Sequence, residues 1–408
     1  MFIALESVGA QATGIYHADS EAVTPYLNRL AQSSWVVRNA YAAVPHTSKA
    51  LVAINCGVNP SFLHPIFESH FGVRERCLAD LLAEQGYQTL FMQSPTEHFE
   101  NRRGTATQLG YRQFIAHEQL DTTGYQLASY FGYEDNILLN PSRTWLEQQT
   151  GLFVAFYLTG TSHHPYWVPD DHPQQTFDRD NADRNAYLNA VNYLDRFVEQ
   201  LIDQYRDTGH YDNTLFVIVG DHGESFGQHP RMQHNASLYQ EVMQIPLLIH
   251  GPAITGPAKE IPLASQLDIM PTLLSLAGFK AHHAMEGIDL NVAGAQREFA
   301  IANCWYDDWC MAAADTRFKY IHNFDEKGDE LYDLVNDPLE RHNIIAQHPQ
   351  WAAQRRAAVQ EALARNRQQW HAFLASQTPD YWNRRDATVG TPIALMKLPP
   401  GDPRNQPH

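Results

Sequence analysis

Short apolar runs alternate with amphipathic stretches along the first two thirds of the chain. The runs with the length of β-strands are Phe2–Leu5, Thr89–Gln93, Leu152–Leu158, Leu215–Val219 and Pro246–His250. Helices are expected near Tyr26–Ala31, Ser48–Ile54, Leu78–Glu84 and Asn185–Tyr205. In the last of these, apolar residues recur at spacings of three and four, which marks one buried helix face. The alternation predicts an α/β fold with a mostly parallel central sheet sandwiched by helices.

The pattern changes after about residue 290. Phe299–Cys304 and Phe318–Phe324 are strand-like, and because short polar turns join the strands here, a small antiparallel C-terminal subdomain is expected. A helical run follows at Trp351–Phe373, and the proline-rich residues from Thr378 are expected to be extended or disordered. The sequence therefore divides into a large α/β domain (1–290), an antiparallel subdomain (291–345) and a C-terminal helix with a tail (346–408).

Composition argues against several classes of protein. The 408 residues are 44% hydrophobic and 18% charged, which is typical of a globular chain with a sizeable core. A net charge of −17 argues against a nucleic acid partner. The apolar runs are much shorter than the roughly 18 residues of a membrane span, and Met1 leads directly into a strand with no signal peptide. The 21 histidines point to metal or phosphate chemistry.

Four cysteines are too few for a disulfide scaffold, and none has the CxxC spacing of a zinc site. Cys304 and Cys310 are close enough in sequence to form a disulfide, which would suit an oxidising compartment. The sequence leaves equally open that these cysteines are buried free thiols.

Polar residues stand where several predicted strands end. Glu6 follows the first strand, Asp221 and His222 follow Leu215–Gly220, and Thr47 stands where a helix begins. Taken alone, Thr47 is more simply explained as a helix N-cap, and the Asp-His pair could be turn residues. Together, however, Glu6, Asp221 and His222 offer the ligands of one divalent cation at the edge where such sheets bind ligands. A hydroxyl beside that cation and a helix N-terminus would attack a phosphoryl or sulfuryl centre.

These segments resemble the alkaline phosphatase/sulfatase superfamily, and most closely its lipoteichoic acid synthase-like phosphoglycerol transferases and phosphoethanolamine transferases. The matching segments follow the family's order over residues 1–345. They include Leu5-Glu6-Ser7, His46-Thr47-Ser48-Lys49-Ala50, Asn101-Arg102, Leu109–Phe114, Tyr193-Leu194-Asp195, Asp221-His222-Gly223-Glu224, Asp268–Leu273 and Glu330–Leu334.

The resemblance implies a role for each matched residue. One divalent ion, Mn²⁺ or Zn²⁺ with Mg²⁺ or Ca²⁺ as alternatives, would be bound by Glu6, Thr47, Asp221 and His222. Thr47 would be the nucleophile and form a covalent intermediate, and Arg102 would grip the non-bridging oxygens of the substrate. His163 and His234 would face the same oxyanion or protonate the leaving group.

Three further residues are candidates for substrate binding. Lys49 would contact the phosphate or be a solvated helix residue. His98 and His164 would contact the substrate or be surface or structural histidines.

The chain also departs from its relatives. Formylglycine sulfatases need a Cys or Ser, then Pro or Ala two residues later and Arg two beyond that. This pattern is absent around Thr47. Threonine cannot be oxidised to that aldehyde, which favours phosphoryl over sulfuryl transfer. Glu6 stands alone where many sulfatases use two aspartates, so one metal ion is expected.

The expected reaction is therefore metal-dependent cleavage or transfer of a phosphodiester of the phosphoglycerol or phosphoethanolamine type. The alternatives are a sulfatase-like ester hydrolase lacking formylglycine and a catalytically inactive binding module. The expected partner is a small anionic ester or a lipid- or glycan-linked phosphodiester. Membrane contact would come only through a missing anchor or a lipid substrate. If the chain is an excised ectodomain, it would be periplasmic or extracytoplasmic. If it is a form that has lost its anchor, it would be cytoplasmic.

Overall fold

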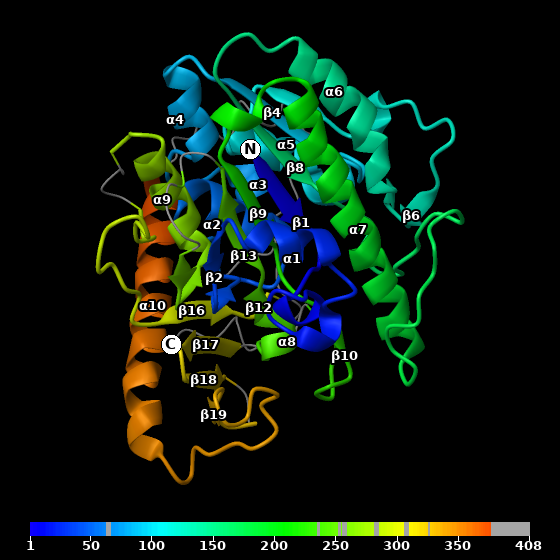
Figure 1. Cartoon of the computed structure of the whole chain (residues 1–408). Helices are drawn as coiled ribbons and strands as arrows, with labels where there is room; N and C mark the ends of the chain where they lie inside the picture. Colours follow the sequence, from blue (N-terminus) through cyan, green and yellow to red (C-terminus); the bar gives the residue numbers. More distant parts are fainter. Residues whose placement is uncertain are drawn as a thin grey trace, which may run out of the picture.

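The computed structural model of the chain describes residues 1–62, 67–234, 237–251, 254, 259–280, 285–305, 310–324 and 327–376. The tail expected from Thr378 lies outside these residues. An eight-stranded sheet forms the centre (Figure 1). Its order is β14 (Glu260–Ile261), β2 (Trp35–Val37), β13 (Leu247–His250), β9 (Phe216–Gly220), β1 (Phe2–Leu5), β8 (Phe153–Leu158), β4 (Gln88–Gln93) and β5 (Gln113–Ile115).

The sheet is mostly parallel, as the sequence predicts. Strands β9, β1, β8, β4 and β5 all run in one direction. Strand β13 is the exception, because it is antiparallel to both of its neighbours, β9 and β2. The predicted strands at Thr89–Gln93 and Leu152–Leu158 are confirmed to within one residue at each end as β4 and β8.

Each face of the sheet is buried under helices. Along β1, Phe2 and Ala4 pack into one core, and Ile3 and Leu5 pack into the other. The first core is closed by α2 (Thr47–Cys56), α4 (Leu78–Glu84) and α9 (Ile269–Leu276). The second is closed by α1 (Pro25–Ala31), α6 (Leu139–Glu147) and α7 (Ala182–Asp207) (Figure 1). Continuously apolar strands such as Phe2–Leu5 are what a sheet covered on both faces requires.

A second sheet is antiparallel, as expected for the C-terminal region. Its order is β16 (Ala300–Asn303), β17 (Cys310–Ala314), β18 (Phe318–Asn323) and β19 (Glu330–Asp333). One face packs against α10 (Pro349–Ser376), where Met311 and Tyr320 meet Val359. The other face joins the main core through Ala312 and Ala314. The small sheet therefore extends the main hydrophobic core.

The remaining elements are short. They are α3 (Phe67–Phe71), α5 (Arg102–Gln108), α8 (Gln240–Met243), the hairpins β6–β7 (Leu127–Ser129, Gly132–Tyr133) and β10–β11 (Ser225–Phe226, Met232–Gln233), and the small sheet of β3 (Ala40–Tyr41), β12 (Gln244–Ile245) and β15 (Ala264–Ser265). Among the helices that the structure describes, none combines the length and the apolar character needed to cross a membrane.

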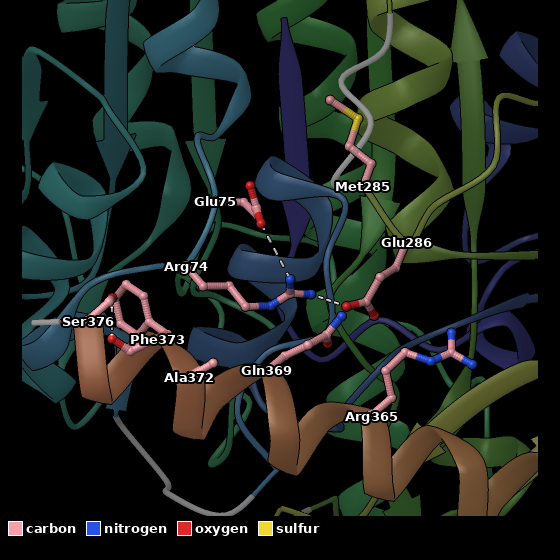
Figure 2. Close-up of a pocket in the computed structure, with 9 residues that line it drawn as sticks. All are labelled: Arg74, Glu75, Met285, Glu286, Arg365, Gln369, Ala372, Phe373 and Ser376. Atoms are coloured by element: carbon pink, nitrogen blue, oxygen red, sulfur yellow. Dashed lines mark hydrogen bonds and ion pairs between the residues drawn. The ribbon is translucent and has the colours of Figure 1, made fainter.

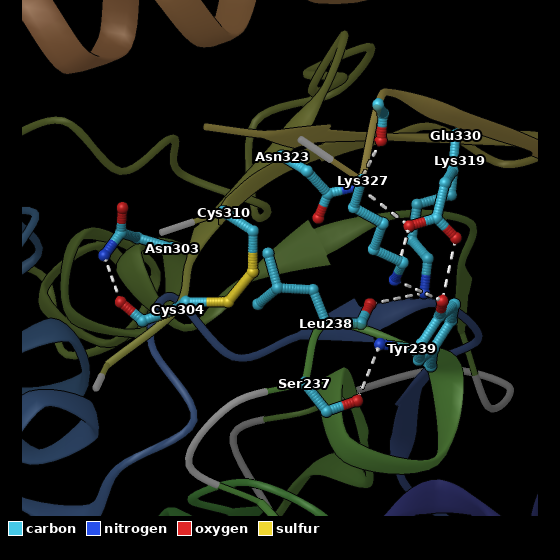
Figure 3. Close-up of a disulfide and its surroundings, with 11 residues drawn as sticks. Ser237, Leu238, Tyr239, Asn303, Cys304, Cys310, Lys319, Asn323, Lys327 and Glu330 are labelled. Atoms are coloured by element: carbon cyan, nitrogen blue, oxygen red, sulfur yellow. Dashed lines mark hydrogen bonds and ion pairs between the residues drawn. A yellow bond between two sulfur atoms is a disulfide. The ribbon is translucent and has the colours of Figure 1, made fainter. Parts of the chain in front are cut away.

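All four cysteines are paired. Cys304 and Cys310 form a disulfide that joins the end of β16 to the start of β17 (Figure 3), so the free-thiol alternative is wrong. Cys56 and Cys77 form a second disulfide, which ties the end of α2 to the residue before α4. Their sequence separation of 21 gave no signal of this pairing.

Candidate active site and metal centre

Polar residues meet at the carboxyl ends of three neighbouring parallel strands. Glu6 follows β1, Thr159 follows β8 and Asp221 follows β9. The Glu6 amide donates to Thr159 Oγ1 at 3.0 Å. The Ser7 amide donates to Asp221 Oδ1 at 2.8 Å, and the Ser7 hydroxyl donates to Glu6 Oε1 at 3.0 Å. Ser7 reaches both carboxylates because its φ of 57° turns the chain sharply after β1.

Glu6, Asp221 and His222 form one buried cluster. Each offers a ligand atom, and the three atoms lie within 4.8 Å of one another. His222 Nε2 is 3.4 Å from Asp221 Oδ2 and 3.7 Å from Glu6 Oε1. The structure therefore brings these three residues together, and their role as metal ligands stays a prediction.

The chemistry of this cluster fits a divalent cation. Asp221 Oδ2 and His222 Nε2 are buried and receive no hydrogen bond from the described residues. Burial, and then the charge of Glu6, raise the pKa of Asp221 well above its usual value. Two adjacent carboxylates and an unpaired imidazole nitrogen are costly when buried unless a positive charge joins them. A cation bound by these three residues would supply that charge.

Thr47 and Ser48 face different partners at the start of α2. The helix begins at Thr47, and His46 occupies the N-cap position. Thr47 Oγ1 donates to Glu6 Oε2 at 3.0 Å, so its hydroxyl lies against the metal cluster. Ser48 Oγ donates to Glu100 Oε2 at 2.7 Å. The N-cap alternative for Thr47 is therefore wrong, and of the two hydroxyls only that of Thr47 touches a predicted metal ligand.

Arg102 lies beside Ser48 together with a carboxylate that the sequence reasoning missed. Arg102 is buried, and its NH1 donates to Ser48 Oγ at 3.1 Å. Glu100 Oε1 is 2.7 Å from His46 Nε2, and Glu100 Oε2 is 3.7 Å from Arg102 NH2. Glu100 and Asn101 have φ values of 51° and 52°, a left-handed turn that glycine usually makes. The sequence has no glycine or motif at these positions that would predict this turn.

The two predicted catalytic histidines lie next to the cluster. The His234 ring stacks on His222 with centroids 3.9 Å apart, and the His163 ring is 6.3 Å from His234. His234 Nδ1 is 3.2 Å from Glu224 Oε2. Burial, and then the charges of His222 and His163, lower the pKa of His234 well below its usual value, whereas burial raises that of Glu224 to about 7. Glu224 was missed as a site residue, although Asp-His-Gly-Glu contains it.

The remaining predicted substrate residues lie in different settings. Lys49 is buried, with Nζ 2.7 Å from Glu68 Oε2. His98 is exposed, and its ring has no hydrogen bond, ion pair or ring contact with the described residues. His164 is also exposed and contacts the ring of Tyr166. Substrate binding by these three residues stays a prediction.

The buried Lys49–Glu68 ion pair is expected to contribute to the stability of the fold. We expect Glu68→Gln to lower the free energy of unfolding by about 3 kcal/mol, because it removes the carboxylate charge that lies 2.7 Å from a buried ammonium. Urea unfolding at pH 7 measures this. Glu199→Gln is the matched control, since it removes an exposed partner of Arg29 and should cost less than about 1 kcal/mol. Wild-type stability of Glu68→Gln would contradict a structural role for the pair.

A surface pocket lies elsewhere, along one side of α10. Figure 2 shows Arg74 pointing at Glu286 across it, with Gln369 and Phe373 of α10 below. None of the residues lining this pocket is one of the predicted site residues. The Glu286 amide donates to the carbonyl of Gly57 at 2.8 Å, and Gly57 caps the end of α2 opposite Thr47. The chemistry predicted from the sequence therefore belongs to the other end of that helix.

The site thus places a hydroxyl at a helix start beside three metal-type ligands, at one edge of a mostly parallel sheet. This arrangement can be compared with known protein families. The chain belongs to the sulfatase family, whose model, described as Sulfatase, matches residues 1–279. A second model, described as N-sulphoglucosamine sulphohydrolase, C-terminal, matches residues 229–369.

The named relatives include both sulfatases and lipoteichoic acid synthases. A Delta 4,5-hexuronate-2-O-sulfatase of Bacteroides thetaiotaomicron is 26% identical over 224 residues, covering 51% of this chain and 46% of the relative. The lipoteichoic acid synthase-like YvgJ of Bacillus subtilis is 25% identical over 315 residues, covering 74% and 51%. The chain thus spans about half the length of these curated relatives.

Solved structures show the same fold. A protein in the alkaline phosphatase superfamily from Vibrio parahaemolyticus is 26% identical, with a TM-score of 0.68, over 82% of this chain and 79% of that one. The lipoteichoic acid synthase LtaP from Listeria monocytogenes is 19% identical, with a TM-score of 0.73, over 90% of each chain. The expected superfamily resemblance and fold class are confirmed.

Proposed function

We propose that the protein cleaves or transfers a phosphodiester of the phosphoglycerol or phosphoethanolamine type through a covalent intermediate on Thr47. The observation that carries this proposal is the 3.0 Å hydrogen bond from Thr47 Oγ1 to Glu6 at the start of α2. It brings a hydroxyl nucleophile to a buried cluster suited to a metal. Because threonine cannot become a formylglycine aldehyde, the ordinary sulfatase reaction has no nucleophile here.

The proposed reaction has two displacements at phosphorus. Thr47 Oγ forms a bond to phosphorus while the bond from phosphorus to the leaving alcohol breaks, and Glu6 is placed to accept the threonine proton. His163 is proposed to give a proton to the leaving alkoxide, and His234, whose pKa burial holds well below its usual value, to face the oxyanion. Water or a second alcohol then attacks phosphorus while the bond from phosphorus to Thr47 Oγ breaks; His163 takes the proton of the attacking hydroxyl, and Thr47 recovers its proton from Glu6. A divalent cation held by Glu6, Thr47, Asp221 and His222 would favour the ionised hydroxyl and offset charge on the phosphoryl group.

Arg102 is proposed to hold the non-bridging oxygens during these steps. We expect Arg102→Ala to lower kcat/KM for a phosphodiester by about 1.5–3 kcal/mol, roughly 10- to 150-fold, because a charge-assisted contact is lost. Metal content, measured by elemental analysis, should not change. Arg103→Ala is the matched control, since Arg103 is exposed and pairs with Glu97. Full activity of Arg102→Ala would remove Arg102 from the substrate site.

A second candidate is hydrolysis of sulfate esters without formylglycine. It is favoured by the sulphohydrolase C-terminal model over residues 229–369 and by the sulfatases among the relatives. Rates on p-nitrophenyl sulfate and bis(p-nitrophenyl) phosphate, compared after metal reconstitution, separate the two. Turnover of the sulfate ester alone would favour this second candidate. An inactive binding module is disfavoured, because Glu6, Thr47, Asp221 and His222 are all present and together.

We also propose a class of natural substrate and a cellular compartment. A lipid- or glycan-linked anionic ester would suit both groups of relatives. The disulfides Cys56–Cys77 and Cys304–Cys310 favour an oxidising compartment, in keeping with a periplasmic or extracytoplasmic domain.

A further inference from the structure

Two positively charged side chains near the start of α2 each lie beside a carboxylate. Arg102 NH2 lies 3.7 Å from Glu100 Oε2, and Lys49 Nζ lies 2.7 Å from Glu68 Oε2. Both pairs are largely buried, with the Glu100 side chain 13% exposed. A carboxylate beside Arg102 weakens the attraction of the site for anions, so its presence calls for an explanation.

The Glu100 carboxylate is held by hydrogen bonds with both sequence neighbours of Thr47. It contacts the residue before Thr47 through His46 Nε2 at 2.7 Å and the residue after it through Ser48 Oγ at 2.7 Å. The left-handed backbone of Glu100 and Asn101 makes this position possible and is itself unfavourable for residues other than glycine. The contacts with α2 offset that cost, so the carboxylate stays beside the nucleophile.

The Glu100 carboxylate is negatively charged under physiological conditions. Burial works to raise its pKa, but the hydrogen bonds with His46 and Ser48 and the charge of Arg102 outweigh burial and hold the pKa below its usual value. Any ester oxygen gripped by Arg102 therefore lies within a few ångströms of a fixed negative charge.

We propose that Glu100 determines specificity by charge: it offsets Arg102 so that the site accepts esters with one negative charge and rejects those with two. Phosphodiesters and sulfate monoesters carry a single charge. Phosphate monoesters carry a second charge above their second pKa of about 6. That second charge would meet Glu100 at short range, where like charges repel strongly. The proposal rests on the proposed function in taking Arg102 as the residue that holds the ester.

The test compares substrates within each variant of the metal-loaded enzyme. For wild type, Glu100→Gln and Glu100→Asp, kcat/KM is measured at pH 8 for bis(p-nitrophenyl) phosphate and for p-nitrophenyl phosphate. Glu100→Gln keeps the shape and removes the charge, so the ratio of diester to monoester activity should fall about tenfold. Glu100→Asp keeps the charge, so its ratio should stay near wild type even if both rates fall. Glu97→Gln, on the same turn but paired with exposed Arg103, is the control.

A binding measurement removes the dependence on turnover. In a Thr47→Ala background, calorimetry with the same two compounds should show that Glu100→Gln strengthens binding of the monoester relative to the diester. An unchanged ratio in both the kinetic and the binding experiment would overturn the proposal. Failure of the proposed function looks different: p-nitrophenyl sulfate would be hydrolysed and the diester would not. The charge proposal is then tested by the ratio of sulfate ester to phosphate monoester activity.

Discussion

Replacing Thr47 with alanine is expected to abolish turnover, with kcat falling by about 10⁴-fold or more, as for other enzymes that lose their nucleophile. The hydroxyl of Thr47 is the one that donates to Glu6 in the metal cluster. Metal binding should fall only in part, because Glu6, Asp221 and His222 remain. Thr47→Ser should be partly active, since it keeps the hydroxyl and loses the methyl group that restricts its rotamer.

Ser48→Ala is the matched control for this experiment. Ser48 bonds to Glu100 and Arg102, so its removal should cost about 1 kcal/mol and leave substantial activity. Initial rates on bis(p-nitrophenyl) phosphate with added metal measure both variants. An inactive Ser48→Ala beside an active Thr47→Ala would show that the nucleophile is the neighbouring hydroxyl.

Metal removal is expected to have the second largest effect. At a metal concentration 100 times its Kd, binding should stabilise the fold by about 2.7 kcal/mol and raise Tm by several degrees. Asp221→Asn should lose this shift together with activity. Without metal, however, Asp221→Asn should be at least as stable as wild type, because it removes the repulsion between two buried carboxylates. Thermal unfolding with chelator, Mn²⁺ or Zn²⁺ measures these effects.

Asp212→Asn is the control for the metal experiment, since Asp212 is an exposed aspartate before β9. It should keep the wild-type shift in Tm. A metal-induced shift that survives in Asp221→Asn would place the metal elsewhere in the chain.

The sequence predicted the centre of the fold because buried parallel strands leave a plain signal. Phe2–Leu5 is apolar at every position and ends in a carboxylate, and Leu215–Gly220 ends in Asp221-His222. Parallel neighbours end at the same edge of a sheet, so strand ends that are far apart in sequence come together. The meeting of Glu6 with Asp221 follows from this rule.

The features that the sequence did not predict depend on contacts between distant segments. Glu100 acts on residues 52 and 54 positions away through a left-handed turn that has no glycine to mark it. The pairing of Cys56 with Cys77 and of Lys49 with Glu68 likewise depends on how α2 packs against α3 and the segment before α4. Strand β2, three residues long, is too short for a periodic pattern to reveal.

The covalent intermediate on Thr47 is the central claim, and mass spectrometry tests it most directly. The metal-loaded enzyme is incubated with a phosphodiester, quenched in acid, digested and searched for modified peptides that contain Thr47 and Ser48. The account predicts a phosphoryl-linked adduct on Thr47 that is absent from Thr47→Ala. An adduct on Ser48, or steady turnover with Thr47 unmodified in rapidly quenched samples of both wild type and slow variants, would contradict it.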